Sequence, residues 1–450
     1  MTPTLAAAPI SALVGPVAAP PFLTSQLLLS CVVIAIMVNV LAGLAGISIY
    51  MERKISAWMQ DRIGPNRVGF GLGLPILEKL TGGFGFWGLG QSLADGIKML
   101  LKEDFTPAGV DKVLFRIAPG LAVIPALISF AIIPWGGLVH IPAYIIPFID
   151  WLVPAQTAIV AGANLNIGVV YVFAVGSLSI YAVALGSWAS NNKFSFLGGL
   201  RASSQMLSYE IPMGLSILVV LLITGSLMPM DIARWQYAHG WMVFSQPLVA
   251  AIAFICILAE CNRAPFDNAE CESELVGGYH TEFSSMRFGL FFLAEYINMA
   301  VGAALFSIMF LGGWQLLPWV ELPGLNPADT MWWAPLAKFA VLFGKVFGLI
   351  CFMMVVRWSL PRLRYDQVMQ MAWQAVIPTS MLALVGNAIL VYYGQTTLVP
   401  MLLLNVGLGV LILGVQPLLP KTVSNRKMSL PGSRFSTGTT ADTLAHLPAN

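Results

Sequence analysis

The chain has 450 residues, of which 58% are hydrophobic and 10% are charged, whereas ordinary soluble domains carry about 25% charged residues. Its mean hydropathy is +0.80, so it has neither the polar surface of a soluble globule nor the charge of a disordered chain. The net charge of +2 is too small to indicate nucleic-acid binding. We therefore expect an all-α polytopic membrane protein with the bilayer as its main solvent.

Nine apolar runs approach the roughly 20 residues that a helix needs to cross a bilayer. The fifth is the weakest because Pro247 interrupts it. The alternating pattern of a membrane barrel is absent, so the backbone groups of these runs must be paired within helices. The nine predicted spans are residues 24–50, 117–139, 165–189, 206–227, 241–259, 287–311, 334–356, 368–393 and 397–418.

The two ends of the chain differ from the rest in composition. Residues 1–23 are uncharged, rich in Ala and Pro, and lack the basic n-region of a signal peptide, so we expect a short disordered lead. Residues 420–450 are polar and predict a flexible cytoplasmic tail. Residues 24–419 form the predicted transmembrane domain, with inside loops at 51–116, 190–205, 260–286 and 357–367.

The placement of Lys and Arg predicts the orientation. Of the 23 basic residues, 20 fall in the loops after odd-numbered spans or in the tail. One falls in a loop after an even-numbered span, and Lys338 and Lys345 lie within the seventh span. Because basic residues accumulate on the cytoplasmic side, this alternation predicts an outside N-terminus and an inside C-terminus.

The first inside loop contains an amphipathic segment at residues 91–103. At helical spacing it places Leu93, Ile97, Leu100 and Leu101 on one face, with the charged side chains off that face. This pattern predicts a helix that lies on the inner membrane surface or under a partner. The alternative is a solvated connector.

The loop after the fifth span is strongly acidic. Nearby like charges repel, and partial desolvation raises the pKa of a carboxyl group, so such a stretch is functional or is neutralised by a partner. The alternative is a solvated acidic loop; Phe266 and Tyr279 within it argue against that reading. Locally only Arg263 offsets its six acids, which are Glu260, Asp267, Glu270, Glu272, Glu274 and Glu282.

Four charged residues lie beyond the first residue of a predicted span: Glu210, Glu295, Lys338 and Lys345. Glu295 follows Arg287 by eight residues, which corresponds to roughly 12 Å along a helix. Charges at such depth are costly and usually mark an ion or substrate path, so we expect the two acids to bind and release protons. The alternatives are a buried pair for Glu295 and snorkelling to the interface for Lys338.

The five cysteines contain no CxxC pair, and the four histidines lack the HExxH spacing. We therefore predict no metal site, and in particular no iron–sulfur or structural zinc site, on this chain. Redox centres, if the system needs them, belong to another subunit. The residues alone thus indicate a proton-handling membrane subunit.

Several segments in order resemble the H-subunit family of NADH-quinone oxidoreductase, respiratory complex I. The resemblance covers about residues 25–395, and its most specific stretch runs from Ala259-Glu260-Cys261-Asn262-Arg263 to Gly278-Tyr279-His280-Thr281-Glu282. The other matching segments are residues 52–54, 61–69, 91–104, 291–296 and 361–367.

The resemblance implies a membrane component without a redox centre of its own that belongs to a translocating enzyme. It would form much of a quinone access tunnel, lined by Arg53, Arg62, Asp95, Arg263 and Phe266. The acidic loop would couple quinone reduction to a proton path that begins at Glu210 and Glu295. The inner end would be closed by Arg357, Arg362 and Arg364.

The resemblance also implies the partners and the location. This chain alone would bind no cofactor; a quinone such as ubiquinone would be its substrate, and FMN and iron–sulfur clusters would lie on partner subunits. Those partners would be peripheral quinone-site subunits and antiporter-like membrane subunits of complex I, together with membrane lipid, in a bacterial inner membrane. Residues 74–90 are an insertion relative to the family pattern.

Two other functions stay open at this point. A membrane-bound hydrogenase uses a related anchor subunit without quinone. A free-standing ion transporter would show inverted repeats with discontinuous helices in both halves, and the sequence has no such symmetry.

Overall fold

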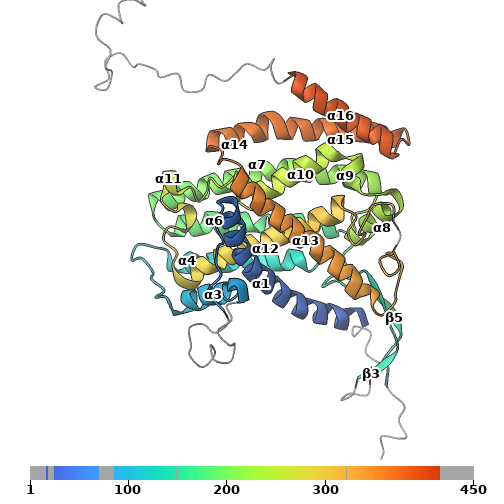
Figure 1. Cartoon of the computed structure of the whole chain (residues 1–450), viewed down its shortest axis with the longest axis horizontal. Helices are drawn as coiled ribbons and strands as arrows, with labels where there is room; N and C mark the ends of the chain where they lie inside the picture. The colour runs from blue at the N-terminus through green and yellow to red at the C-terminus, as the bar shows by residue number, and fades with distance from the viewer. Residues whose placement is uncertain (1–16, 19–24, 70–85, 147–150, 321, 416–450) are drawn as a thin grey trace, which may run out of the picture. The chain divides into compact units, whose positions relative to one another are not determined.

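The computed structural model describes residues 17–18, 25–69, 86–146, 151–320 and 322–415, and these form mostly helices with little strand (Figure 1). The chain divides into two units, Met1–Val406 and Gly407–Asn450. The described part of the second unit is the last turns of one helix, residues 407–415. The predicted tail, most of the predicted lead and residues 74–85 of the insertion lie outside the described residues.

Each of the nine predicted apolar runs overlaps one helix or consecutive helices. The second run, 117–139, was predicted too long, because its helix ends at Phe130 and the chain turns before Pro134. These helices form because the apolar runs are long and their backbone groups pair most simply within a helix. The helices are α1 (Ser25–Met59), α4 (Lys112–Phe130), α5 (Gly168–Gly176) with α6 (Leu178–Ala189), α7 (Lys193–Thr224), α9 (Met242–Ser245) with α10 (Pro247–Glu260), α12 (Ser285–Phe310), α13 (Ala334–Ser359), α14 (Tyr365–Met371) with the π-helical turn Ala372–Val376 and α15 (Ile377–Tyr392), and α16 (Leu398–Val415).

Seven helical segments within the described residues are long and apolar enough to cross a membrane. Two apolar helices are shorter, Pro247–Glu260 and Leu398–Ile412. The weak fifth run is indeed interrupted, because Gln246 leaves the helical conformation between α9 and α10 and Pro247 begins α10. Nine crossings and the inside–outside orientation stay predictions.

Local sequence signals set the helix ends. The Asp111 side chain accepts hydrogen bonds from the backbone N–H groups of Val113 and Leu114 and so caps α4. Asn192 caps α7 in the same way through Phe194. Gly225 ends α7 in the left-handed conformation, at φ 68°, that favours glycine.

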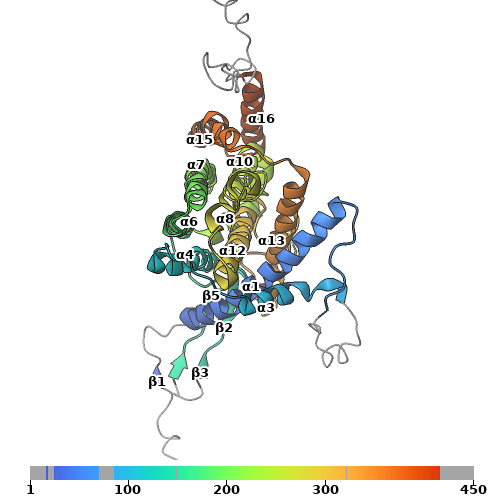
Figure 2. The ribbon, with the colours of Figure 1, turned by 90° about the vertical axis from the view of Figure 1, so that its left-hand side faces the viewer.

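The helices pack around α12. It lies against α4, α10 and α13, while α6 lies between α4 and α7 (Figures 1 and 2). Within the most apolar window of each helix, 72% of α12 is buried but only 22% of α1. α12 is therefore the central helix, and α1 offers most of its surface to lipid or to partner subunits.

Shorter elements connect these helices. The prediction of an all-α chain omitted five short strands, because runs of two to four residues carry too little periodicity to be told from loops. Strand β2 pairs antiparallel with β5, and β4 pairs with β1 and β3. The short elements are β1 (Val17–Ala18), the turn Phe86–Gly88, α3 (Gln91–Leu101), β2 (Leu138–Ile141), β3 (Tyr144–Ile146), β4 (Trp151–Val153), β5 (Gln156–Ile159), α8 (Pro229–His239), α11 (Glu272–Leu275) and the 3-10 turn η3 (Gly278–His280).

Candidate functional site

Glu52, in the last third of α1, gathers side chains from three other parts of the chain. Its carboxylate lies 2.5 Å from the Arg357 guanidinium of α13 and 3.3 Å from that of Arg263, which follows α10. The Tyr296 hydroxyl of α12 donates a hydrogen bond to it at 2.5 Å. One acid thus joins four segments that are distant in sequence.

Arg263 connects Glu52 to the intramembrane acid Glu295. Its Nη2 lies 3.4 Å from a Glu295 oxygen, and its guanidinium stacks over the Tyr296 ring at 4.4 Å. The side chain is only 5% exposed. Burial opposes the charged form, but Tyr296, Glu295 and Glu52 outweigh it and hold the Arg263 pKa well above its ordinary value. Arg263 therefore stays a cation between two acids.

Tyr279, in the turn η3, connects Glu295 to the acidic loop. Its hydroxyl lies 3.0 Å from Glu295 Oε1 and 3.3 Å from Glu270 Oε1. The His280 Nδ1 lies 3.5 Å from the same Glu270 oxygen. Burial raises the pKa of Glu270, and its hydrogen bond with Glu295 opposes the rise. We call Glu52, Arg263, Glu270, Tyr279, Glu295, Tyr296 and Arg357 together the charged cluster.

Two other acids of the loop form ion pairs within the chain, although the sequence shows only Arg263 nearby. Asp267 lies 2.6 Å from Arg362, and Glu274 lies 2.5 Å from Arg201 of α7. Burial raises the Asp267 pKa, and Arg362 and Arg357 oppose the rise.

Two further acids complete the account of the loop. Glu282 accepts a hydrogen bond of 2.5 Å from Asn192. Glu272 begins α11, and its side chain lies outside what the structure describes. The fold thus supplies countercharges and donors from α7, α13 and the segment after α13.

Glu260 differs from the other loop acids, because it is the last residue of α10 and lines a cavity that also contains Glu295. Tyr279, Asn262 and Asn298 contribute polar groups to the same cavity, which has room for a water molecule. The charge of Glu210 on α7 acts on Glu260 electrostatically. The shared cavity groups Glu260 with Glu295 rather than with the other acids of the loop.

The five predicted tunnel residues separate into two groups. Arg53 of α1 and Asp95 of α3 form an ion pair at 2.6 Å, and the exposed Arg62 follows shortly after α1. Arg263 and Phe266 instead lie in the buried part of the site, where Phe266 packs on Tyr209 with ring centroids 5.4 Å apart. Among the described residues, no ion pair or hydrogen bond joins the first group to the second, although Glu52, next to Arg53 in the chain, pairs with Arg263.

Helix α3 matches the predicted amphipathic segment. Its polar side is tied to α1 by the Ser92 hydroxyl, which donates to the Gly46 carbonyl at 2.5 Å. The side chains of Leu93, Leu100 and Leu101 are 48%, 65% and 83% exposed. The described part of the chain therefore leaves most of this apolar face exposed, with Ile97 partly buried, as expected for a helix that meets lipid or a partner.

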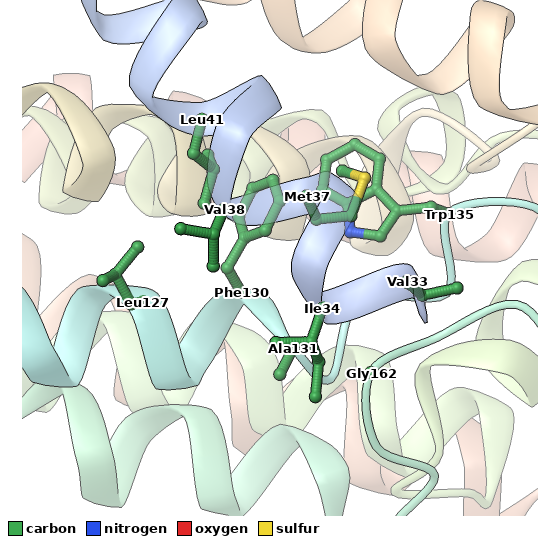
Figure 3. Close-up of a pocket in the computed structure, with 10 residues that line it drawn as sticks. All are labelled: Val33, Ile34, Met37, Val38, Leu41, Leu127, Phe130, Ala131, Trp135 and Gly162. Carbon is green, nitrogen blue, oxygen red and sulfur yellow. The ribbon is translucent and has the colours of Figure 1, made fainter. Parts of the chain in front are cut away.

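An apolar pocket lies elsewhere on α1, between this helix, the end of α4 and the segment that follows α4 (Figure 3). Met37 and Leu41 line it from α1, and Phe130 and Trp135 line it from the other side. It contains no ionisable side chain, so it takes no part in the charged cluster.

The remaining predicted cations have simple partners. Arg364 pairs with Asp366 at the surface, at 3.2 Å. Lys345 donates to three backbone carbonyls beyond the end of α12, at residues 311, 313 and 315. Lys338 is buried within the protein and donates to the Asp329 carbonyl at 2.9 Å. These two lysines are held by main-chain oxygens.

The site also contains three residues that were not predicted as site residues from the sequence: Glu52, Tyr279 and Tyr296. All three lie in matching segments, and Tyr296 directly follows Glu295, so position in these motifs was the available signal. Among the residues that the structure describes, there is no group of three or more His, Cys, Asp or Glu that could hold a metal ion.

Comparisons with known proteins identify the relatives of this chain. The chain is similar to the NADH-quinone oxidoreductase H subunit of Flavobacterium psychrophilum, with 42% identity over 76% of this chain and 91% of the relative. It is 43% identical to an H subunit of the same enzyme from Cytophaga hutchinsonii over 77% of this chain and 92% of the relative. It is 42% identical to an H subunit of this enzyme from Geobacter sulfurreducens, over 78% of this chain and 92% of the relative. The NADH dehydrogenase family model matches residues 31–388, and the chain therefore belongs to the NADH dehydrogenase family.

Proposed function

We propose that this chain forms the quinone access path of a proton-pumping NADH-quinone oxidoreductase and couples quinone reduction to proton translocation. Its relatives are named as the H subunit of that enzyme, and the chain is accordingly a membrane subunit of complex I. The single observation that carries the coupling role is the charged cluster, which joins the acidic loop to an acid on the central helix α12.

The quinone path is proposed along α1 and α3. The Arg53–Asp95 pair places two charged side chains beside the uncovered apolar face of α3. An isoprenoid tail needs an apolar passage open to lipid, and a headgroup needs hydrogen-bonding partners. The exposed surface of α1 and α3 offers the apolar passage. The hydrogen-bonding partners for the headgroup would be Arg53, Asp95 and Arg62.

The coupling is proposed to run through the charged cluster. Reduction of a quinone by two electrons requires two protons or an equivalent shift of charge. A group of buried acids opposed by few cations responds to such a shift by changing its protonation, because the members titrate together. Glu295 would then pass protons to Glu260 and Glu210 across the cavity that Glu295 and Glu260 share.

The partners follow from the same argument. The electrons must come from subunits that carry FMN and iron–sulfur clusters and that meet the acidic loop and α3. Moving one charge against the membrane potential costs about 2.3 kcal/mol per 100 mV, so antiporter-like membrane subunits would share the pumping. We place the complex in a bacterial inner membrane. The relatives named above are quinone enzymes, which favours this function over a hydrogenase anchor.

The test is replacement of Glu295 by Gln in the whole complex, reconstituted in lipid vesicles. Quinone reduction is followed optically and proton uptake with a pH-sensitive dye. We expect proton translocation to collapse in the variant, while Asp231→Asn, which changes an exposed acid far along the chain, behaves as wild type. Wild-type quinone reduction together with wild-type proton stoichiometry in Glu295→Gln would refute the proposal.

A further inference from the structure

The Tyr279 hydroxyl is shared by two carboxyl groups that belong to different parts of the site. Glu270 is in the acidic loop, and Glu295 is on the central helix α12. The hydroxyl oxygen lies 3.3 Å from the first and 3.0 Å from the second. Both carboxyl groups contact this one hydroxyl, so Tyr279 bridges the acidic loop and α12.

The ring of Tyr279 is held firmly. It packs edge-on against Phe291 and His280, and the residue is 2% exposed. The Ser195 hydroxyl of α7 donates to the Tyr279 carbonyl at 2.8 Å. At Gly198 an added Cβ would lie 2.7 Å from the Tyr279 backbone nitrogen, so only glycine lets α7 approach this closely. The O–H bond is then the one part of Tyr279 left to rotate.

A tyrosine hydroxyl has a single proton to donate. It can stabilise a carboxylate at Glu295 or at Glu270, but not at both in one orientation. Burial holds the Tyr279 pKa well above its ordinary value, and the nearby charges of Glu295 and Glu270 add to this effect. The group therefore stays a neutral hydroxyl and does not rest as a phenolate between two acids.

We propose that Tyr279 relays protons between the acidic loop and α12, by accepting a proton from Glu270 as it donates its own to Glu295. This inference rests on the proposed function and adds a defined step to it. Protonated Glu270 gives its proton to the Tyr279 oxygen while Tyr279 gives its own proton to the Glu295 carboxylate. The products are a Glu270 carboxylate, a neutral Tyr279 and a protonated Glu295. After the transfer the Tyr279 O–H bond points to Glu270, and the step can repeat only after this bond rotates back to Glu295.

The experiment compares Tyr279→Phe with Tyr209→Phe in the whole complex reconstituted in vesicles. Both changes remove one buried hydroxyl and keep the ring; the Tyr209 hydroxyl donates to the backbone carbonyl of Val368 and touches no acid of the charged cluster. We expect proton translocation in Tyr279→Phe to fall about tenfold, the equivalent of one hydrogen bond to a charged group. Tyr209→Phe should stay within about twofold of wild type.

A second measurement separates proton transfer from packing. Difluorotyrosine incorporated at position 279 restores the hydroxyl, and should restore translocation and the infrared carboxyl bands that Tyr279→Phe shifts. Translocation that stays low with difluorotyrosine would assign Tyr279 a packing role and overturn the inference. Wild-type translocation in Tyr279→Phe beside a collapse in Glu295→Gln would overturn it too, and would leave the proposed function standing. Wild-type translocation in Glu295→Gln would overturn both this inference and the proposed function.

Discussion

Replacing Arg263 by Met should disable proton translocation more strongly than any other removal of a cation from the charged cluster. Met has a similar volume but no charge, so the change removes the ion pairs of Arg263 with Glu52 and Glu295 and its stacking on Tyr296. Glu52 keeps Arg357 at 2.5 Å and the Tyr296 hydroxyl. The loss therefore falls mainly on Glu295, whose ion pair with Arg263 is the one that the structure shows.

The magnitude follows from burial. Removing one partner of a buried ion pair costs about 3–5 kcal/mol, because the other charge is left uncompensated. At about 1.4 kcal/mol per tenfold change, this corresponds to a factor of roughly a hundred or more against the Glu295 carboxylate. Glu295 would then keep its proton, and we expect translocation to fall by about two orders of magnitude. Arg263→Lys should be intermediate, because Lys keeps the charge but loses the planar fork.

The assay uses the assembled complex in lipid vesicles, with quinone reduction and dye-detected proton uptake recorded together. Arg234→Met is the matched control, because it removes the same kind of side chain from a pair in which Arg234 is 44% and Asp231 is 37% exposed. Such surface pairs contribute about 0–1 kcal/mol, so this variant should resemble wild type. An assembled Arg263→Met complex that translocates protons within about twofold of wild type would show that Glu295 does not depend on this cation.

Three further predictions concern other parts of the chain. Asp95→Asn breaks the partly exposed Arg53–Asp95 pair, so it should lower stability by under about 1 kcal/mol. It should nevertheless raise the KM for quinone, and an unchanged KM would argue against a quinone path beside α3. Burial raises the Glu270 pKa, so the folded state binds this proton more tightly than the unfolded chain does. The stability of the wild type therefore falls as the pH rises from the unfolded pKa of about 4.3 through the raised folded value. Glu270→Gln lacks this dependence, so its Tm relative to wild type should increase between pH 5 and pH 8, and a constant difference would contradict the reasoning. Asn405→Leu removes the buried donor that α16 gives to Gln246 at 2.6 Å and should lower stability by about 1–3 kcal/mol; an unchanged Tm would show that this contact does not hold α16.

The sequence predicted the helical architecture well, because the signal is carried by each apolar run alone. For example, the length and hydropathy of residues 334–356 are enough to predict a helix, and α13 has nearly the same bounds. The depth of Glu295 could be derived in the same local way, from its distance along the chain to Arg287. The strands β2 and β5 were missed because each has four residues and depends on its partner.

The pairing of charges could not be predicted, because it depends on tertiary structure. Glu52 and Arg263 are 211 residues apart, and no local pattern links them. The same holds for Glu274 with Arg201 and for Asp267 with Arg362, so the acidic loop looked almost uncompensated in sequence. Most of the acids of the site could thus be identified from the sequence, whereas their partners are seen only in the folded structure.

The reach of Glu52 along the chain has a consequence for biogenesis. Its three partners follow it by 211, 244 and 305 residues. At the usual synthesis rate of about 5–20 residues per second, the ribosome needs roughly 15–60 s to deliver Arg357 after Glu52. During that interval the acid of the first helix gains Arg263 and Tyr296, and the arrival of α13 adds the third partner. A nascent chain released before α13 emerges would therefore hold α1 by two of the three contacts of Glu52.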